Sequence, residues 1–500
     1  MSALAAAVLP PATDPHGSHG SARDLYRALW DASARDTRPQ GIEAWLDEQL
    51  SQAGKLRCPL PEDPAALHAW MDGNVDAVGQ AYAAYRARRA AGGRREMFAN
   101  RSHALYFLAH VGPTKRVDGA WLYGLLSRAG DPRLAALVNT YLEELGDGDP
   151  AQNHVTVFRE LLRRTGADSL PVEEDDRYVQ GAVQMALGAC GMRYVPEVIG
   201  FNLGYEQLPL HLQISAYELD ELGIDPFYFT VHITVDNADS GHARQAVDTV
   251  LAALPSDPVA RQRFYTRVRR GFMLNELGIG STAIARAFDL EQSVVGMMAR
   301  KARYGKAAHA DTCRIAGRSV NEWLAGGEAC VPGLLQALQD AKWIVRHRDP
   351  AESRFWKLLH GPHAEMFGVF GPAELQLLYD WIAGDCPDYL PGPAAAGAAA
   401  RPLVGGRHLS YRAQRRLEAR RGAATQASEA WPAEGPTPQA GERDPDYDAP
   451  ADALSQACAH ADDALARLAL LRPYLAPARH HTQEGLHATR LFSTSFRAQR

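Results

Sequence analysis

The stretch FYFTVHITVDNADSGH, residues 227–242, places two histidines and two aspartates within eleven residues of one another. Residues three, four and seven apart share one face of an α-helix, so His232, Asp236 and Asp239 would line up, with His242 at the edge of that face. Apolar residues flank this face, and a buried carboxylate is costly unless a cation compensates it. The stretch therefore predicts a metal-binding helix.

The same stretch supports a second interpretation equally well. β-Branched residues dominate FTVHITV, residues 229–235, which is typical of a strand. The sequence Asn-Ala-Asp-Ser-Gly would then follow as a turn, and its polar residues would only be solvated.

Helical periodicity governs much of the sequence on both sides of this stretch. Residues 176–224 form an almost uncharged helical run that is interrupted at Pro196 and Pro209. Upstream, apolar residues recur three and four apart with charges between them. This spacing is found in ARDLYRALWDASA (22–34), GIEAWLDEQLSQA (41–53) and DAVGQAYAAYRARRAA (76–91). The patterns predict an all-α protein.

Composition places the chain among soluble globular proteins. Of its 500 residues 46% are hydrophobic and 22% are charged, and the formal net charge of -6 provides no general attraction for nucleic acid or anionic membranes. The six cysteines form no CxxC pair, which argues against a zinc ribbon and favours reduced thiols. No stretch reaches the ~18 apolar residues that cross a bilayer, and Pro10 and Pro11 break the apolar N-terminal run. We expect a cytoplasmic protein.

Further polar residues stand out against apolar sequence upstream. Asp118 lies beside Gly119, where an isolated aspartate is most often a helix N-cap. Glu144 closes one predicted helix and His154 opens the next, across a loop rich in glycine and aspartate; taken alone, such residues usually face solvent. Glu206 stands among leucines, where burial of a carboxylate requires a partner.

Together the sequence supplies three carboxylates, Glu144, Glu206 and Asp236, and three histidines, His154, His232 and His242. This is the ligand chemistry of a non-haem diiron or iron/manganese centre. Thiolate ligands are absent from the set, which disfavours structural zinc and iron–sulfur clusters. No P-loop, GxGxxG, GxSxG, HExxH or EF-hand pattern occurs in a convincing context. The predicted metal ligands are Glu144, His154, Glu206, His232, Asp236 and His242.

Around these residues the sequence resembles the haem-oxygenase-like diiron oxidases, in the branch called iron-containing redox enzymes. The resemblance covers about residues 90–385. The blocks that carry it are VDGAWLYG (117–124), ELGDGDPAQNH (144–154), GFNLGYEQLPLHL (200–212) and HITVDNADSGH (232–242), with a looser match in HGPHAEMFGVFGPAELQLLYDWI (360–382).

The resemblance implies a haem-oxygenase-like helical bundle that holds two Fe(II) ions, or iron with manganese, and no haem. It also implies O2 as co-substrate and oxidation of a small, amino-acid-derived substrate by N-oxygenation or oxidative C–C or C–N cleavage in specialised metabolism. The family usually carries a glutamate where this chain has Asp118, so Asp118 becomes a further candidate ligand or a packing residue. The longer spacing to His242 leaves Asp239 as an alternative ligand.

We expect five parts along the chain, because low-complexity sequence separates helical sequence. Histidines of the last part, such as His480 and His481, are expected to be disordered rather than ligating. The parts are a disordered leader (1–22), N-terminal helices that cover the core (23–89), the metal-binding bundle (90–385), a linker (386–450), and a C-terminal helix with a tail (451–500).

A function of another class is the alternative. Residues 276–300 superficially suggest a helix-turn-helix, and residues 411–421 are basic, so the chain could be a non-catalytic DNA-binding or scaffolding helical protein. A hydrolytic or cofactorless enzyme of the same shape is a closer alternative. We favour the diiron oxidase or oxygenase. The expected partners are a small-molecule substrate and an electron donor or reductase, and no nucleic acid or membrane. A homodimer is compatible with the sequence.

Overall fold

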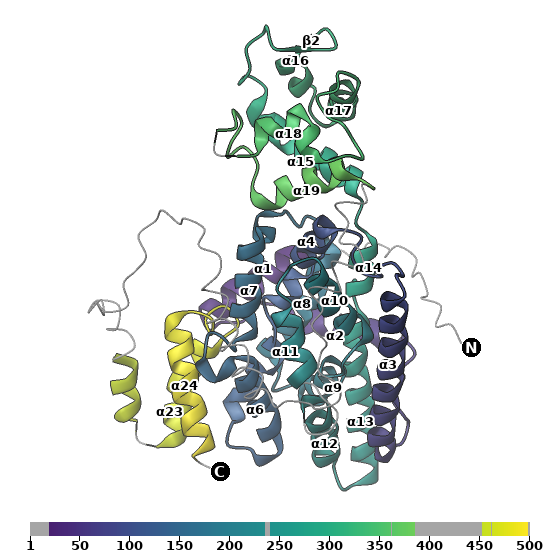
Figure 1. Ribbon diagram of the computed structural model, residues 1–500. Helices are drawn as coiled ribbons and strands as arrows, with labels where there is room; N and C mark the ends of the chain where they lie inside the picture. Colours follow the sequence, from purple (N-terminus) through teal and green to yellow (C-terminus); the bar gives the residue numbers. More distant parts are fainter. Residues whose placement is uncertain (1–19, 236–240, 362, 386–452, 462, 499–500) are drawn as a thin grey trace, which may run out of the picture.

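The structure, a computed structural model, is built almost entirely of α-helices (Figure 1). It describes residues 20–235, 241–361, 363–385, 453–461 and 463–498. Within these residues the only strands are β1 (Arg314–Ile315) and β2 (Arg318–Ser319), which pair as a short antiparallel hairpin. The predicted all-α fold is confirmed. None of the described helices is both long enough and apolar enough to cross a lipid bilayer.

The main body is a bundle of helices with three N-terminal helices packed on it (Figure 1). The N-terminal helices are α1 (Ala22–Ala34), α2 (Ile42–Ala53) and α3 (Leu67–Ala90). The bundle consists of α4 (Arg101–His110), α5 (Gly112–Lys115), α6 (Ala135–Glu144), α7 (His154–Thr165), α8 (Val179–Cys190), α9 (Val195–Tyr205), α10 (Leu210–Glu221), α11 (Phe227–Val235), α12 (His242–Ala253) and α13 (Pro258–Met273).

Short 3-10 helices connect many of these elements. They are η1 (Pro64–Ala66), η2 (Ala120–Arg128), η3 (Pro132–Leu134), η4 (Gly146–Gly148), η5 (Ala167–Ser169), η6 (Asp175–Tyr178), η7 (Leu274–Glu276), η8 (Gly327–Cys330), η9 (Pro350–Glu352) and η10 (Arg472–Leu475).

Helices α9 and α13 pack closely against one another. Gly200 of α9 lies against the Val268 carbonyl oxygen, and Gly271 of α13 lies against the Glu197 carbonyl oxygen. A side chain at either glycine would overlap the facing backbone, so both positions require glycine for the two helices to approach this closely. Arg267 and Glu197 add a two-point ion pair, with both nitrogen–oxygen distances at 2.6 Å. The end of α9 is therefore fixed by backbone packing.

Two apolar cores fill the bundle, and the residues that flank the predicted ligands fall into both. Leu145, Leu203 and Ala243 belong to the first core. Phe158 and Tyr228 belong to the second. The polar side chains between them therefore lie at the border of two hydrophobic clusters, away from water.

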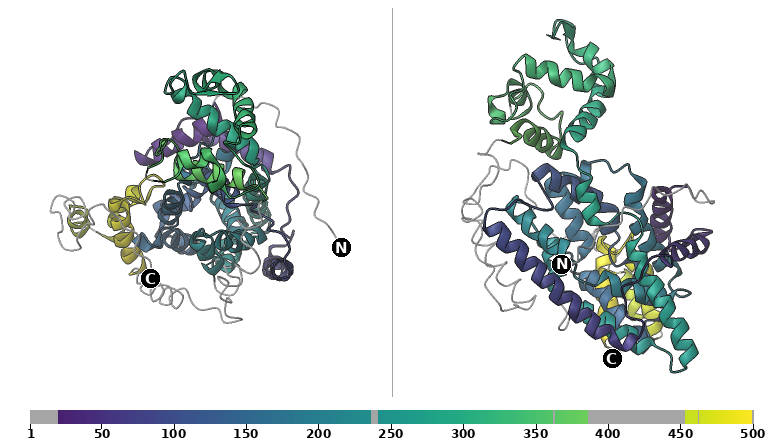
Figure 2. Two further views of the ribbon diagram at one scale, coloured as in Figure 1. Left: turned by 45° about the horizontal axis from the view of Figure 1, so that its top comes forward. Right: turned by 90° about the vertical axis from the view of Figure 1, so that its right-hand side faces the viewer.

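A lobe formed by residues 290–383 projects from one end of the bundle (Figures 1 and 2). It has a core of its own, which includes Met297, Leu335 and Trp381. Its helices, with the preceding α14 that packs on α4, are α14 (Ser281–Arg286), α15 (Leu290–Gly305), α16 (Val320–Ala325), α17 (Val331–Asp340), α18 (Arg354–Leu359) and α19 (Pro372–Ala383). The boundaries expected from the sequence, which placed residues 90–385 in one bundle, stay a prediction.

The segment suggested as a helix-turn-helix uses its apolar residues for packing. Val294, Met297 and Met298 of α15 are buried in the lobe core. The basic segment 411–421 lies outside the described residues.

The C-terminal part packs on the bundle through α23 (Ala464–Leu471), η10 and α24 (Gln483–Arg497). The expectation that its histidines are disordered is wrong for His480, of which 1% is exposed. The physical reason is an apolar face of the C-terminal part, which was not recognised among its charged residues. Leu471, Leu475 and Phe492 of this face belong to the first core.

Candidate metal centre

Two groups of buried side chains could each hold a metal ion, and they share one residue. The first group is Asp118, Glu144, His154 and His232, and the second is Glu144, Glu206 and His242. Within each group, one ligand atom per residue lies within 4.8 Å of the others. All six residues are buried. Glu144 is thus common to two adjacent groups of candidate ligand atoms.

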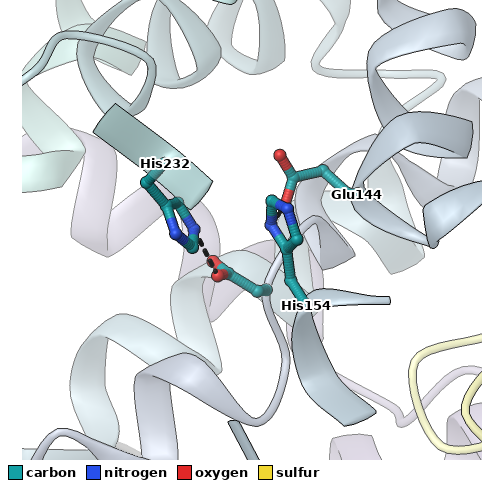
Figure 3. Close-up of side chains that lie close together, drawn as sticks. Glu144, His154 and His232 are labelled. Atoms are coloured by element: carbon teal, nitrogen blue, oxygen red, sulfur yellow. Dashed lines mark hydrogen bonds and ion pairs between the residues drawn. The ribbon is translucent and has the colours of Figure 1, made fainter. Parts of the chain in front are cut away.

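Helix ends place the first pair of ligands. Glu144 is the last residue of α6 and His154 is the first of α7, and a loop of residues 145–153 connects them. The Asn153 side chain caps α7 by accepting from the Thr156 backbone N–H at 3.0 Å. His154 Nδ1 lies 2.6 Å from Glu144 Oε2, and Figure 3 shows the two side chains facing one another, with His232 beside them.

His232 of α11 is oriented by its own helix. Its Nδ1 lies 2.7 Å from the Tyr228 carbonyl oxygen, which only accepts, so Nδ1 carries the proton. Its Nε2 faces Asp118 Oδ2 at 3.3 Å. These two atoms can share a proton in a hydrogen bond, or they can be two ligands of one metal ion.

His242, the first residue of α12, is held from the opposite side. Its Nε2 donates to Glu143 Oε2 at 2.6 Å, which leaves Nδ1 to face Glu206 Oε2 at 3.3 Å and Glu144 Oε1 at 3.8 Å. Metal-binding histidines commonly donate their second N–H to a carboxylate in this way. Burial acts to raise the pKa of Glu143, but the bonds from His242 and Asn139 outweigh it and hold the pKa below its usual value.

Asp118 lies in the turn between α5 and η2 and accepts from two tyrosine hydroxyls. Tyr205 donates to Oδ1, and Tyr228 donates to Oδ2 at 2.6 Å. Lys115 Nζ lies 3.9 Å from Oδ1 and donates to the Tyr205 oxygen at 2.8 Å. Burial alone would raise the pKa of Asp118, yet Lys115 and His232 lower it below its usual value. Burial and the Asp118 charge raise the pKa of Tyr205 and Tyr228 well above 10, so both hydroxyls stay protonated donors.

The donor set fits iron. Asp118, Glu144 and Glu206 bring three carboxyl groups into the interior, and Lys115 lies close to that of Asp118. Carboxylates that stay ionised in such surroundings need further cations. Carboxylate oxygen with imidazole nitrogen is a ligand combination that suits iron and manganese.

The structure brings together five of the six predicted ligands, which are Glu144, His154, Glu206, His232 and His242. Asp118, the further candidate, lies with them. Asp236 and Asp239 lie outside the described residues. The N-cap role considered for Asp118 is not found, because Gly119 precedes η2 and no side chain caps that element.

The single helix predicted for residues 227–242 is wrong. Helix α11 is described as far as Val235, and α12 begins at His242 after Gly241, whose extended conformation breaks a helix. The helical spacing suggested that His232 and His242 share one helix, whereas they come from consecutive helices and face different carboxylates.

The sequence did not lead us to predict four residues that lie at the centre, which are Glu143, Lys115, Tyr205 and Tyr228. Tyr205 precedes a predicted ligand, and Tyr228 lies one turn before another, which was the available signal. Glu143 had no signal, since neighbouring residues on a helix point about 100° apart and only one was expected to face inward.

Residues 105–276 match the family described as iron-containing redox enzymes. This segment is similar to the iron-containing redox enzymes. The comparisons with curated proteins and with solved structures gave no match. The matched segment holds all six residues of the two groups, and its helices agree with the predicted haem-oxygenase-like, all-α fold. The match supports an iron-dependent oxidoreductase, and the buried carboxylates and histidines are compatible with iron.

Proposed function

We propose that this chain is a non-haem diiron oxidase or oxygenase. The observation that carries the proposal is the position of Glu144, which belongs to both groups of ligand atoms. A carboxylate shared in this way can bridge two cations. Asp118, His154 and His232 would complete one position, and Glu206 and His242 the other. Asp236, outside the described residues, is kept as a further ligand, and iron with manganese is the alternative pair.

The surrounding residues would prepare the site for redox chemistry. Two Fe(II) ions supply electrons for the reduction of O2. The hydroxyls of Tyr205 and Tyr228 hold Asp118, and Glu143 holds His242, so the ligand atoms are oriented before any metal enters. The apolar cores on both sides exclude water, which protects a reactive oxidant from side reactions.

The reaction requires a small organic substrate, for which we propose an amino-acid-derived compound. Reduction of O2 to water takes four electrons, so the electrons that the substrate does not provide must come from an electron donor or reductase. Such a donor is the partner that we propose for this chain.

Iron content and spectroscopy test the proposal. Anaerobic loading with Fe(II) should give about two irons per chain, as carboxylate-bridged sites of this type hold two ions. A pulse of O2 should then produce the Mössbauer spectrum of two coupled ferric ions. Glu144→Ala should lower the iron content at both positions, and Glu206→Ala mainly at one.

Three outcomes would contradict the proposal. A single iron per chain would exclude the paired site, and full iron content in Glu144→Ala would exclude the bridge. Tight binding of two irons with no O2 uptake would favour a hydrolytic enzyme of the same shape.

A further inference from the structure

The C-terminal segment, residues 463–498, packs against the bundle next to the loop that joins two proposed ligands. We call residues 145–153, between Glu144 and His154, the ligand loop. Helix α24 lies along η4 of this loop, and Figure 1 shows α23 and α24 in yellow beside α6. The segment lies outside the family match at residues 105–276.

Asp147, in the middle of the ligand loop, is held by two side chains of α24. Its Oδ1 accepts from Ser493 Oγ at 2.7 Å, and its carboxylate accepts from Arg497 Nη2 at 2.8 and 2.9 Å. Asp147 has φ of 52°, in the left-handed region that asparagine and aspartate adopt more readily than other residues with a side chain. The bonds from α24 therefore hold the side chain of a turn residue in the middle of the loop.

The backbone of the loop also touches α24. Arg490 Nε donates to the Gly148 carbonyl oxygen at 3.0 Å. A Cβ atom at residue 148 would overlap both the Arg490 side chain and the Leu486 carbonyl oxygen. The helix thus lies directly on the loop.

The same segment reaches both ends of the ligand loop. On α6, the Tyr141 hydroxyl donates to the Leu475 carbonyl oxygen at 2.5 Å, one turn before Glu144. At the other end, Asn153 Nδ2 donates to His480 Nδ1 at 3.1 Å and to the Leu145 carbonyl oxygen at 3.2 Å. Asn153 is the cap that starts α7 at His154.

We infer that the C-terminal segment positions the ligands Glu144 and His154 by fixing the loop between them. Arg497, Ser493 and His480 are its positioning residues, and they act through Asp147 and Asn153. This inference rests on the proposed metal site. It gives the last part of the chain, some 300 residues beyond the ligand loop, a role in the affinity of the centre for metal.

Two arginines of the segment provide a matched comparison. Arg497 pairs with Asp147 at 2.8 Å, and Arg472 pairs with Asp36 at 2.9 Å. Both aspartates adopt a left-handed conformation, with φ of 52° for Asp147 and 51° for Asp36. Only Asp147 lies in the ligand loop.

The experiment is an anaerobic titration of the full chain with Co(II), followed by its visible ligand-field absorption. Arg497→Ala should weaken Co(II) binding by about tenfold, at the lower end of the range for groups that orient metal ligands, and should change the absorption bands. Arg472→Ala should bind Co(II) within about twofold of the unmodified chain. Arg497→Lys, which keeps the charge, should restore most of the affinity. Ser493→Ala is a milder second variant should Arg497→Ala fail to fold.

The outcomes separate the inference from the proposed function. Equal affinity in Arg497→Ala, Ser493→Ala and the unmodified chain would overturn the inference and leave the metal site intact. Equal losses in Arg497→Ala and Arg472→Ala would also overturn it, because the effect would then be general destabilisation. Failure of the unmodified chain to bind Co(II) would count against the proposed metal site itself.

Discussion

At the scale of single residues, Glu143 is the side chain that most directly controls a proposed ligand. Its bond to His242 Nε2 fixes which imidazole nitrogen faces Glu206. Glu143→Ala should lower the iron affinity of the Glu206–His242 position by about tenfold. Glu143→Gln keeps an acceptor oxygen without the charge, so its iron affinity should lie between those of Glu143→Ala and the unmodified chain. Equilibrium dialysis with Fe(II) measures both.

Glu160→Gln is the control for this series, because Glu160 pairs with Arg163 and Arg164 on the surface of α7. It should bind iron as the unmodified chain does. An unchanged affinity in Glu143→Ala would show that His242 is oriented by its helix alone.

Substitution of Asp118 tests whether this residue is a metal ligand or only a packing residue. Asp118→Asn would place an amide NH2 against the donors that surround the carboxylate, and we expect a loss of about 1–3 kcal/mol in the free energy of unfolding of the metal-free protein together with a loss of iron. Tyr228→Phe removes one of those donors and should cost about 1 kcal/mol, with the iron retained. Urea unfolding and iron content are the measurements. Full iron content in Asp118→Asn would mean that Asp118 only packs.

At the scale of elements, acidification should release the C-terminal segment. Burial, with Arg159 adding to it, lowers the pKa of His481 to about 4, and burial lowers the pKa of His480 well below its usual value. Below pH 6.5 the unfolded chain takes up protons that the folded chain does not. Each of these histidines therefore stabilises the fold fully above pH 6.5, and this contribution is lost as the pH falls towards 4, by at most about 1.4 kcal/mol per pH unit.

Urea midpoints between pH 7.5 and 4.5 test this expectation, and His481→Gln should flatten the curve. Arg159 Nη1 donates to His481 Nε2 at 2.7 Å, and a glutamine oxygen can accept in its place at any pH. A pH profile that is unchanged in His481→Gln would assign the acid sensitivity to other groups, such as His211, whose pKa is lowered by burial to about 4.

At the scale of the whole molecule, the lobe core is distinct from the bundle cores, although Ala373 of α19 packs in the second bundle core. Truncation of a side chain deep in one core should therefore leave the others intact. Leu335 lies in the lobe core and Leu142 in the first bundle core, next to Glu143 and Glu144. Replacement of either buried leucine by alanine should cost about 2–5 kcal/mol. Only Leu142→Ala should lower the iron content at 25 °C, as measured on the folded protein. Iron loss in Leu335→Ala would show that the lobe supports the metal site.

Local sequence patterns predicted the features that depend on residues close together in the chain. Glu144 and His154 could be found because they end and begin helices whose apolar spacing is clear, and Glu206 because a lone carboxylate among leucines needs a partner. His242 was placed on the wrong helix, since Gly241 breaks a pattern that helical spacing alone would continue. The contacts of Asp147 with Ser493 and Arg497 join residues about 350 positions apart, which no local pattern records.

The close backbone packing of α9 on α13 divides the site into a rigid and an adaptable side. Glu206 follows directly on α9 and cannot shift without separating two backbones that touch at Gly200 and Gly271. His232 sits on a nine-residue helix, α11. Adjustment to different metal ions should therefore occur on the α11 side. In hydrogen–deuterium exchange, amides of α9 and α13 should exchange equally slowly with and without metal, whereas those of α11 should slow down when metal binds.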